Sequence, residues 1–150
     1  MLNKDYKEML QCLNANDVKF LIVGAYAIGA YGYPRATGDI DIWVMAAVDN
    51  SEKIYKALKD FGAPISQIDE HSFSQQGVIL QIGVAPRRID IITKIDGVEF
   101  EGAYRMRKEI NIEGIVIPFI SKSDLIKNKL ATGREKDRID AEMLQSKPDE

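Results

Sequence analysis

The stretch Thr37-Gly38-Asp39-Ile40-Asp41-Ile42 places aspartates and isoleucines in strict alternation. That period of two is typical of a β-strand, so Asp39 and Asp41 share one face while the isoleucines line the other. Aspartate is depleted in strands, and two carboxylates about 4 Å apart repel by roughly 4 kcal/mol at an effective dielectric constant of about 20. A bound divalent cation would reverse the sign of that interaction. The competing interpretation is a solvated face of an edge strand, where the aspartates need no ligand.

A second feature lies upstream, where the apolar segment Phe20–Val23 reads as a buried strand and meets Gly24 and Ala25. Backbone N–H groups at such a junction, together with the dipole of the helix that follows, can bind an anion. The simpler interpretation of the same residues is an ordinary strand–helix turn. The segment therefore predicts an anion site only in combination with the aspartates.

A third feature lies downstream in Arg88-Ile89-Asp90-Ile91-Ile92, where one aspartate again interrupts a β-branched run. The run predicts another strand that carries a carboxylate. The simpler interpretation is a buried or edge aspartate paired with Arg87 or Arg88. Both arginines remain open as partners at this point.

The remaining periodicity predicts helices and strands in mixed order. Apolar residues at helical spacing indicate helices over 6–13, 25–31 and 54–61, the last ended by Gly62. Alternating or β-branched runs indicate strands over 39–44, 78–84, 88–94 and 116–120, and Asp96-Gly97 reads as a hairpin turn into a strand over 98–100. Capping-box spacing at Ser121 and at Thr132 predicts two C-terminal helices separated by Gly133. The predicted class is α+β, with a mixed β-sheet flanked by helices.

Length and composition are those of an ordinary globular protein. With 150 residues, of which 45% are hydrophobic and 29% charged, the chain can bury one core, so we expect a single domain over 1–150 with residues 147–150 frayed. The net charge of −3 and the isoelectric point near 5.3 exclude an overall basic field for binding long nucleic acid, and they leave a local basic face open. A single cysteine, Cys12, excludes an intrachain disulfide, and a lone histidine, His71, argues against a zinc site.

No stretch of the sequence predicts a membrane span or a secretion signal. The longest uncharged run, over 20–33, has 14 residues broken by three glycines and is too short to cross a bilayer. The first residues lack the charged-then-apolar layout of a signal peptide. We therefore expect a cytoplasmic protein without membrane contacts.

Together these residues resemble the nucleotidyltransferase superfamily with the DNA-polymerase-β-like fold. The superfamily pattern is an apolar strand, a glycine-containing turn, Asp-x-Asp and a later single aspartate; here it maps to Gly24-Ala25, Asp39-Ile40-Asp41 and Asp90. The closer similarity is to minimal bacterial members related to abortive-infection nucleotidyltransferase toxins and to minimal-nucleotidyltransferase antitoxins, and it extends to Lys127–Asp137. The resemblance covers nearly the whole chain and implies the polymerase-β-like fold with C-terminal helices.

The resemblance also implies a two-metal phosphoryl transfer, with the three aspartates as both the catalytic and the metal-binding residues. Asp39 and Asp41 would hold a Mg²⁺ that is bound to a nucleoside triphosphate. Asp90 would join them on a second Mg²⁺ and help to deprotonate the acceptor. Mn²⁺ is the other hard cation that suits these oxygen ligands.

The resemblance further implies nucleotide contacts from Gly24, Ala25, Arg35, Thr37, Lys129 and Lys136. The family carries glycine or serine at the second turn position, so Ala25 lacks a hydroxyl for a phosphate and leaves the contact to backbone N–H groups. The basic residues of the C-terminal helices have an alternative interpretation, a salt-bridged helical surface. The acidic residues interleaved with them are Glu135, Asp137 and Asp140.

The implied function is transfer of a nucleoside monophosphate from a nucleoside triphosphate, ATP among them, to an acceptor hydroxyl or phosphate with release of pyrophosphate. The presence of all three carboxylates favours this enzyme. The alternative is an antitoxin-like binding subunit of a toxin–antitoxin pair with weak or no catalysis. The small size leaves room for a protein partner or a homodimer to complete the site, while the acidic isoelectric point disfavours an RNA acceptor.

Overall fold

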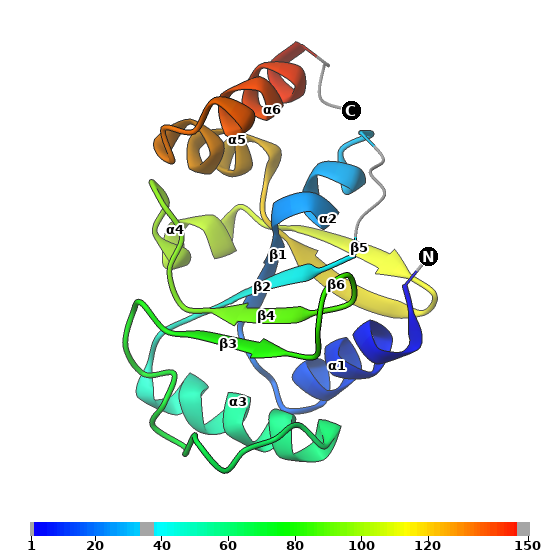
Figure 1. The fold of residues 1–150 in the computed structure, drawn as a ribbon, viewed down its shortest axis with the longest axis vertical. Helices are drawn as coiled ribbons and strands as arrows, with labels where there is room; N and C mark the ends of the chain where they lie inside the picture. The colour runs from blue at the N-terminus through cyan, green and yellow to red at the C-terminus, as the bar shows by residue number, and fades with distance from the viewer. Residues whose placement is uncertain (1, 34–37, 147–150) are drawn as a thin grey trace.

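The computed structural model describes residues 2–33 and 38–146, and one six-stranded mixed sheet forms its centre (Figure 1). The strands are β1 (Phe20–Val23), β2 (Ile40–Val44), β3 (Ile79–Ile82), β4 (Ile89–Ile92), β5 (Lys108–Ile112) and β6 (Ile115–Phe119). The helices are α1 (Lys4–Ala15), α2 (Gly24–Ala30), α3 (Val48–Phe61), α4 (Phe100–Arg105), α5 (Lys122–Ala131) and α6 (Glu135–Ser146). The predicted α+β class and the two C-terminal helices are confirmed.

The strand order β3-β4-β2-β1-β6-β5 puts β2 and β4 side by side. Strand β2 runs parallel to β4 and antiparallel to β1, and β6 runs parallel to β1. The two edge strands, β3 and β5, pair antiparallel with their neighbours. As a result, the end of β1 and the starts of β2 and β4 meet at one place in the sheet.

Helices cover both faces of this sheet, with α1 and α3 on one face and α2, α4, α5 and α6 on the other (Figure 1). Helix α1 buries the predicted apolar stripe, which consists of Tyr6, Met9, Leu10 and Leu13. Gly62 ends α3 in the left-handed conformation, as its position predicted. None of the helices in the described ranges is long and apolar enough to cross a bilayer.

Strand β2 shows how the alternating sequence separates the two faces. Ile40 and Ile42 are fully buried on one side of the strand. Asp41 and Trp43 alternate with them and point to the side of α4, where the Trp43 ring packs edge-on against Phe100 with 5.0 Å between ring centroids. The predicted alternation is therefore confirmed, and it leaves the carboxylate on the face covered by α2, α4 and the C-terminal helices.

The predicted hairpin strand over residues 98–100 is wrong. The chain turns at Gly97, which has a φ of +77°, but it then enters helix α4. Gly97 lies against Ala131 of α5, and the ring of Phe100 packs on both Trp43 and Tyr104. Since the contacts that organise this segment come from other elements, its local sequence does not reveal them.

Two smaller features also differ from the prediction. Strand β5 was not among the predicted elements; it pairs with β6 across a turn at Glu113-Gly114. Thr132 ends α5 instead of capping α6, and its hydroxyl donates to Asp137 at 2.7 Å. By contrast, the cap at Ser121 is confirmed, because its Oγ accepts the N–H of Asp124 at 3.1 Å.

Candidate active site

The three predicted aspartates come together where β2 and β4 begin. Asp39 directly precedes β2, while Asp41 and Asp90 each occupy the second position of a strand. The parallel register sets Asp41 opposite Asp90, and the antiparallel register sets Asp41 opposite Val23 at the end of β1. The sheet thus gathers carboxylates from two distant segments of the chain beside the β1–α2 turn.

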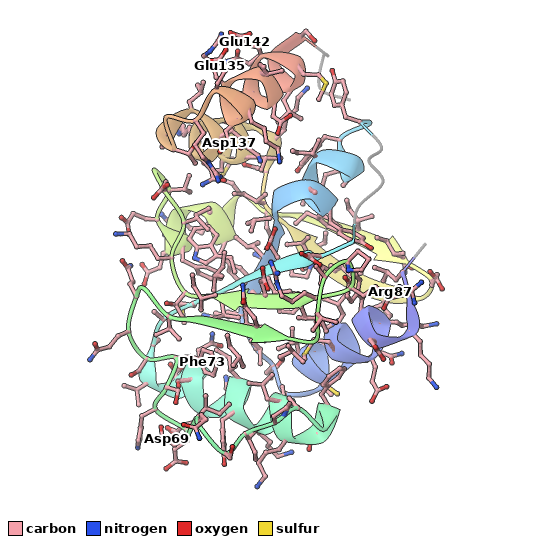
Figure 2. The ribbon with its side chains drawn as sticks, viewed as in Figure 1. Asp69, Phe73, Arg87, Glu135, Asp137 and Glu142 are labelled. Atoms are coloured by element: carbon pink, nitrogen blue, oxygen red, sulfur yellow. The ribbon has the colours of Figure 1, made fainter. Side chains whose placement is uncertain are left out.

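Arg88 is the cation at the centre of this cluster. Its Nε and Nη2 donate to the two carboxylate oxygens of Asp90 at 2.7 and 3.0 Å, and Nη2 lies 3.2 Å from Asp39 Oδ2. Its backbone N–H donates to Asp39 Oδ1 at 2.9 Å. Of the two arginines that the sequence left open as partners of Asp90, Arg88 makes the contact, while Arg87 is exposed at the surface (Figure 2).

Asp41 carries an electrostatic cost in this cluster. Burial, followed by the negative charges of Asp90 and Asp39, raises the pKa of Asp41 to about 6. The positive charges of Lys129 and Arg88 act in the opposite direction without cancelling this effect. Because the raised pKa means that the ionised form is disfavoured, the folded chain holds an unfavourable charge at neutral pH. A further cation beside Asp41 would relieve it.

The cluster suits a hard divalent cation by its chemistry but not by its present spacing. Carboxylate oxygens are the ligands that Mg²⁺ and Mn²⁺ prefer. Within residues 2–33 and 38–146, however, no three carboxylate, histidine or cysteine side chains lie close enough together to hold one ion. The oxygens of Asp39 and Asp90 are turned toward the guanidinium of Arg88. These residues fit a metal ion provided that they reorient around it.

Gly24 lets the end of β1 approach Asp41 closely. Its φ is +70°, and a Cβ at this position would overlap the Oδ2 atom of Asp41. Glycine is therefore required by the backbone conformation and by the space, independently of any nucleotide. Ala25 follows it, half-buried in the first turn of α2.

We expect Gly24→Ala to destabilise the protein by more than the ~1–2 kcal/mol that a left-handed conformation costs a residue with a Cβ, because Asp41 must also move. The matched control is Gly29→Ala in the same helix, where the new Cβ would meet no atom within 4 Å. We expect this control to be neutral or to stabilise the helix by about 0.5–1 kcal/mol. Urea denaturation compares the two variants, and equal midpoints would contradict the close approach.

Tyr6 supports the site from beneath, although the sequence placed it only in the core stripe of the first helix. Its hydroxyl donates to the carbonyl of Gly38, directly before Asp39, and lies 3.3 Å from the carbonyl of Arg88. Burial raises the pKa of Tyr6 to about 12, so the hydroxyl keeps its proton at neutral pH. One side chain of α1 therefore joins the two segments that carry the aspartates. A tyrosine in an otherwise aliphatic stripe is the sequence signal that could have indicated this role.

Lys129 on α5 is held by buried aspartates of α6. Its Nζ lies 3.3 Å from Asp137 Oδ1 and 3.6 Å from Asp140 Oδ2. Figure 2 shows Asp137 where α6 faces α5, and this carboxylate also accepts hydrogen bonds from Thr132 and Arg134, both at 2.7 Å. The arrangement is that of a salt-bridged helix pair. The positive charge of Lys129 opposes the rise in the pKa of Asp41 without cancelling it. This effect links the network around Lys129 to the carboxylate cluster.

Of the remaining predicted nucleotide contacts, Lys136 lies within the described residues. Lys136 is exposed on α6 and takes no part in the network around Lys129, as far as residues 38–146 show. Arg35 and Thr37 lie outside the residues that the structure describes. The structure therefore unites Asp39, Asp41 and Asp90 with Gly24, and it adds Arg88 and Tyr6 to them.

The architecture of the sheet and its helices is that of a nucleotidyltransferase fold, as solved structures of such proteins show. The chain belongs to the family described as nucleotidyltransferases of unknown function (DUF6036), whose model matches residues 1–145. Among curated proteins, none matches the sequence.

Three solved structures are similar to the chain over nearly its whole length. A protein from Thermotoga maritima described as a nucleotidyltransferase has a TM-score of 0.64 and 15% identity, with 98% of this chain and 97% of that chain covered. The lincomycin-bound lincosamide antibiotic adenylyltransferase LnuA has a TM-score of 0.59 and 19% identity, with coverages of 97% and 98%. ANT(2'')-Ia in complex with adenylyl-2''-tobramycin has a TM-score of 0.52 and 14% identity, with coverages of 94% and 95%. At these identities the similarity shows the fold alone.

Proposed function

We propose that the chain is a Mg²⁺-dependent nucleotidyltransferase that moves a nucleoside monophosphate from a nucleoside triphosphate to an acceptor hydroxyl or phosphate. The observation that carries this proposal is the register of β2 and β4, which sets Asp41 opposite Asp90 with Asp39 beside them. Membership of a nucleotidyltransferase family supports the same reaction. Mn²⁺ would serve in place of Mg²⁺, since both prefer oxygen ligands.

In the proposed reaction an acceptor oxygen attacks the α-phosphorus of the nucleotide. The bond from that phosphorus to the oxygen bridging to the β-phosphate breaks, and pyrophosphate leaves. Asp39, Asp41 and Asp90 would hold the metal ions, which would supply positive charge to the phosphates. Asp90, which is only 8% exposed, would accept the proton of the acceptor.

The triphosphate is proposed to lie along the β1–α2 turn. Gly24 has no side chain to block this approach, and the backbone N–H groups of Gly24 and Ala25 would donate to phosphate oxygens. Lys129 is proposed to contribute positive charge, because it already acts on Asp41. Lys136, Arg35 and Thr37 remain proposed contacts on the basis of the sequence pattern alone.

A small acceptor suits this chain better than a large RNA. The net charge of −3 gives no overall positive surface for a nucleic acid. LnuA is named for lincosamide antibiotics and ANT(2'')-Ia was solved with adenylyl-2''-tobramycin, and the alignments cover 98% and 95% of those two chains. We therefore propose a small hydroxylated molecule as the acceptor class.

The second candidate is an antitoxin-like binding subunit with weak or no catalysis. The ion pairs of Arg88 with Asp39 and Asp90 favour it, because the chain itself supplies a cation that occupies these carboxylates. Ile79 on the edge strand β3 and Val84 just beyond it are 66% and 80% exposed, which supports a protein partner or a homodimer at this edge. A purified monomer, established by light scattering, that turns over nucleotide alone would argue against this candidate.

The proposed function is tested first by a thermal-shift titration with Mg²⁺ and each nucleoside triphosphate. A ligand that binds only the folded state adds about 2.7 kcal/mol at 100 times its dissociation constant, so the melting temperature should rise visibly. We expect this rise only when metal and nucleotide are present together. The variant Asp39→Ala/Asp41→Ala should not respond.

The matched control is Glu8→Ala/Glu52→Ala, which removes two exposed carboxylates from α1 and α3 on the opposite face of the sheet. It should respond as the wild type does. An equal response of the aspartate variant would place the nucleotide elsewhere on the protein. Release of pyrophosphate in the presence of hydroxylated small molecules then identifies the acceptor.

A further inference from the structure

The guanidinium of Arg88 occupies the place where the carboxylates of two segments converge. It binds both oxygens of Asp90 at 2.7 and 3.0 Å and reaches Asp39 Oδ2 at 3.2 Å, while its own backbone N–H binds Asp39 Oδ1. Each carboxylate oxygen of Asp39 and Asp90 therefore faces an N–H group of Arg88. Charge-assisted bidentate contacts of this kind are among the strong hydrogen bonds in proteins.

Negative charge is nevertheless in excess at this place. Two carboxylates contact one guanidinium, and Asp41 lies opposite Asp90 in the strand register. Lys129 is itself paired with Asp137 and Asp140. The cluster therefore retains attraction for a cation of higher charge than arginine.

A divalent ion and the guanidinium need the same oxygens. A Mg²⁺ ion at about 2.0–2.1 Å from these oxygens would lie beside the guanidinium, and the two positive charges would repel each other. This explains why the described carboxylates, although adjacent, are not arranged around a common ion position. The side chain of Arg88 is 29% exposed, so it has a route to turn outward into solvent.

We propose that Arg88 is the resident cation of the carboxylate cluster and that a divalent metal ion binds only by displacing its guanidinium from Asp39 and Asp90. Arg88 is thus a positioning residue that keeps the carboxylates together in the metal-free protein. Its contacts lower the affinity of the cluster for a divalent metal ion. This inference rests on the proposed function, since it takes the same aspartates as the metal ligands.

The experiment measures the binding of Mn²⁺ alone, without nucleotide, by the loss of the electron paramagnetic resonance signal of the free ion. We expect Arg88→Gln to bind Mn²⁺ roughly tenfold or more tightly than the wild type, the scale of one lost charge-assisted interaction. Its melting temperature in a chelator should fall, and Mn²⁺ should raise that temperature by more than it does in the wild type.

The matched control is Arg87→Gln, which removes the same formal charge from an exposed neighbour. Its Mn²⁺ affinity should stay within about twofold of the wild type, because an exposed charge is screened by salt. Arg88→Lys decides the question if Arg88→Gln does not fold. A lysine keeps the charge but cannot span both carboxylates, so this variant should also bind Mn²⁺ more tightly than the wild type.

The possible outcomes separate this inference from the proposed function. If the wild type binds Mn²⁺ and the Arg88 variants bind it no more tightly, the displacement is overturned while the proposed function stands. If the Arg88 variants bind Mn²⁺ more tightly but the wild type transfers no nucleotide, the displacement stands and the proposed function falls. If neither the wild type nor the Arg88 variants bind Mn²⁺, both are overturned.

Discussion

Replacing Asp41 with asparagine is expected to abolish nucleotidyl transfer and, at the same time, to stabilise the metal-free protein. Loss of one electrostatic contact to the transition state commonly lowers the rate by about 10²–10³-fold, and loss of a metal ligand should cost at least this much. The stability gain follows from the pKa of Asp41, which is raised to about 6, mainly by burial. Since one pH unit in pKa corresponds to ~1.36 kcal/mol, the charged Asp41 costs up to about 3 kcal/mol at neutral pH.

The way in which the stability gain of Asp41→Asn changes with pH tests whether the gain is electrostatic. A carboxyl whose pKa is higher in the folded protein contributes stability below its unfolded pKa and loses that contribution as the pH rises through the folded pKa. The advantage of Asp41→Asn over the wild type should therefore be small near pH 4, grow up to about pH 6 and remain constant above it. Urea denaturation across this range, with a chelator present, measures it. A constant difference at all pH values would contradict the electrostatic explanation.

The matched control for this variant is Asp137→Asn, the same chemical change at a buried carboxyl of the opposite kind. Burial acts to raise the pKa of Asp137, but hydrogen bonds from Thr132, Lys129 and Arg134 and the charge of Lys129 outweigh it, and the pKa is lowered. Asp137 therefore stabilises the fold above its unfolded pKa and loses this contribution as the pH falls. We expect Asp137→Asn to lower stability at neutral pH, where Asp41→Asn raises it.

Replacing Lys129 with methionine is expected to destabilise the protein by about 3 kcal/mol or more, because it removes one partner of a buried ion pair and leaves the other partners charged. The Lys129 side chain is 13% exposed, and those of Asp137 and Asp140 are 3% and 6% exposed. Arg134 and Thr132 still bind Asp137, so the fold should weaken without being lost. Methionine keeps most of the length of the side chain, which limits the loss of packing.

The matched control is Lys136→Met, the same change at an exposed position of α6. A surface substitution of this kind should stay within about 0.5 kcal/mol of the wild type. Urea denaturation compares the two, and equal stabilities would show that the network around Lys129 contributes little. The thermal-shift titration with Mg²⁺ and nucleotide, applied to both variants, then shows which lysine contacts the triphosphate.

Much of the fold follows from local periodicity. The apolar stripe from Tyr6 to Leu13 predicts a helix because residues at i, i+3, i+4 and i+7 share one face, and α1 buries this stripe. The alternation after Gly38 predicts β2 because strand side chains alternate, and the isoleucines of β2 are buried as expected. Gly62 and Ser121 end and begin helices through their own backbone and side-chain chemistry. These features depend on residues only a few positions apart.

The prediction over residues 98–100 was incorrect because contacts with residues distant in sequence decide the structure of this segment. A strand and a short helix can both carry Val98-Glu99-Phe100, and the decision comes from Trp43 on β2 and Ala131 on α5, which lie far away in sequence. The sequence also predicted only part of the role of Tyr6, because the missing part depends on contacts with distant residues. Helical spacing predicts that its ring is buried, but the position of its hydroxyl beside Gly38 depends on how α1 packs under the sheet.

The sequence by itself predicted that Asp39 and Asp41 share one face, because side chains two positions apart on a strand point the same way, and it left Arg87 and Arg88 open as partners of Asp90. Only the tertiary structure decided that the two strands lie side by side in parallel register, which brings these aspartates into one cluster. Strand pairing is a long-range interaction, so no local pattern specifies it. The same pairing brings the guanidinium of Arg88 within reach of both Asp39 and Asp90.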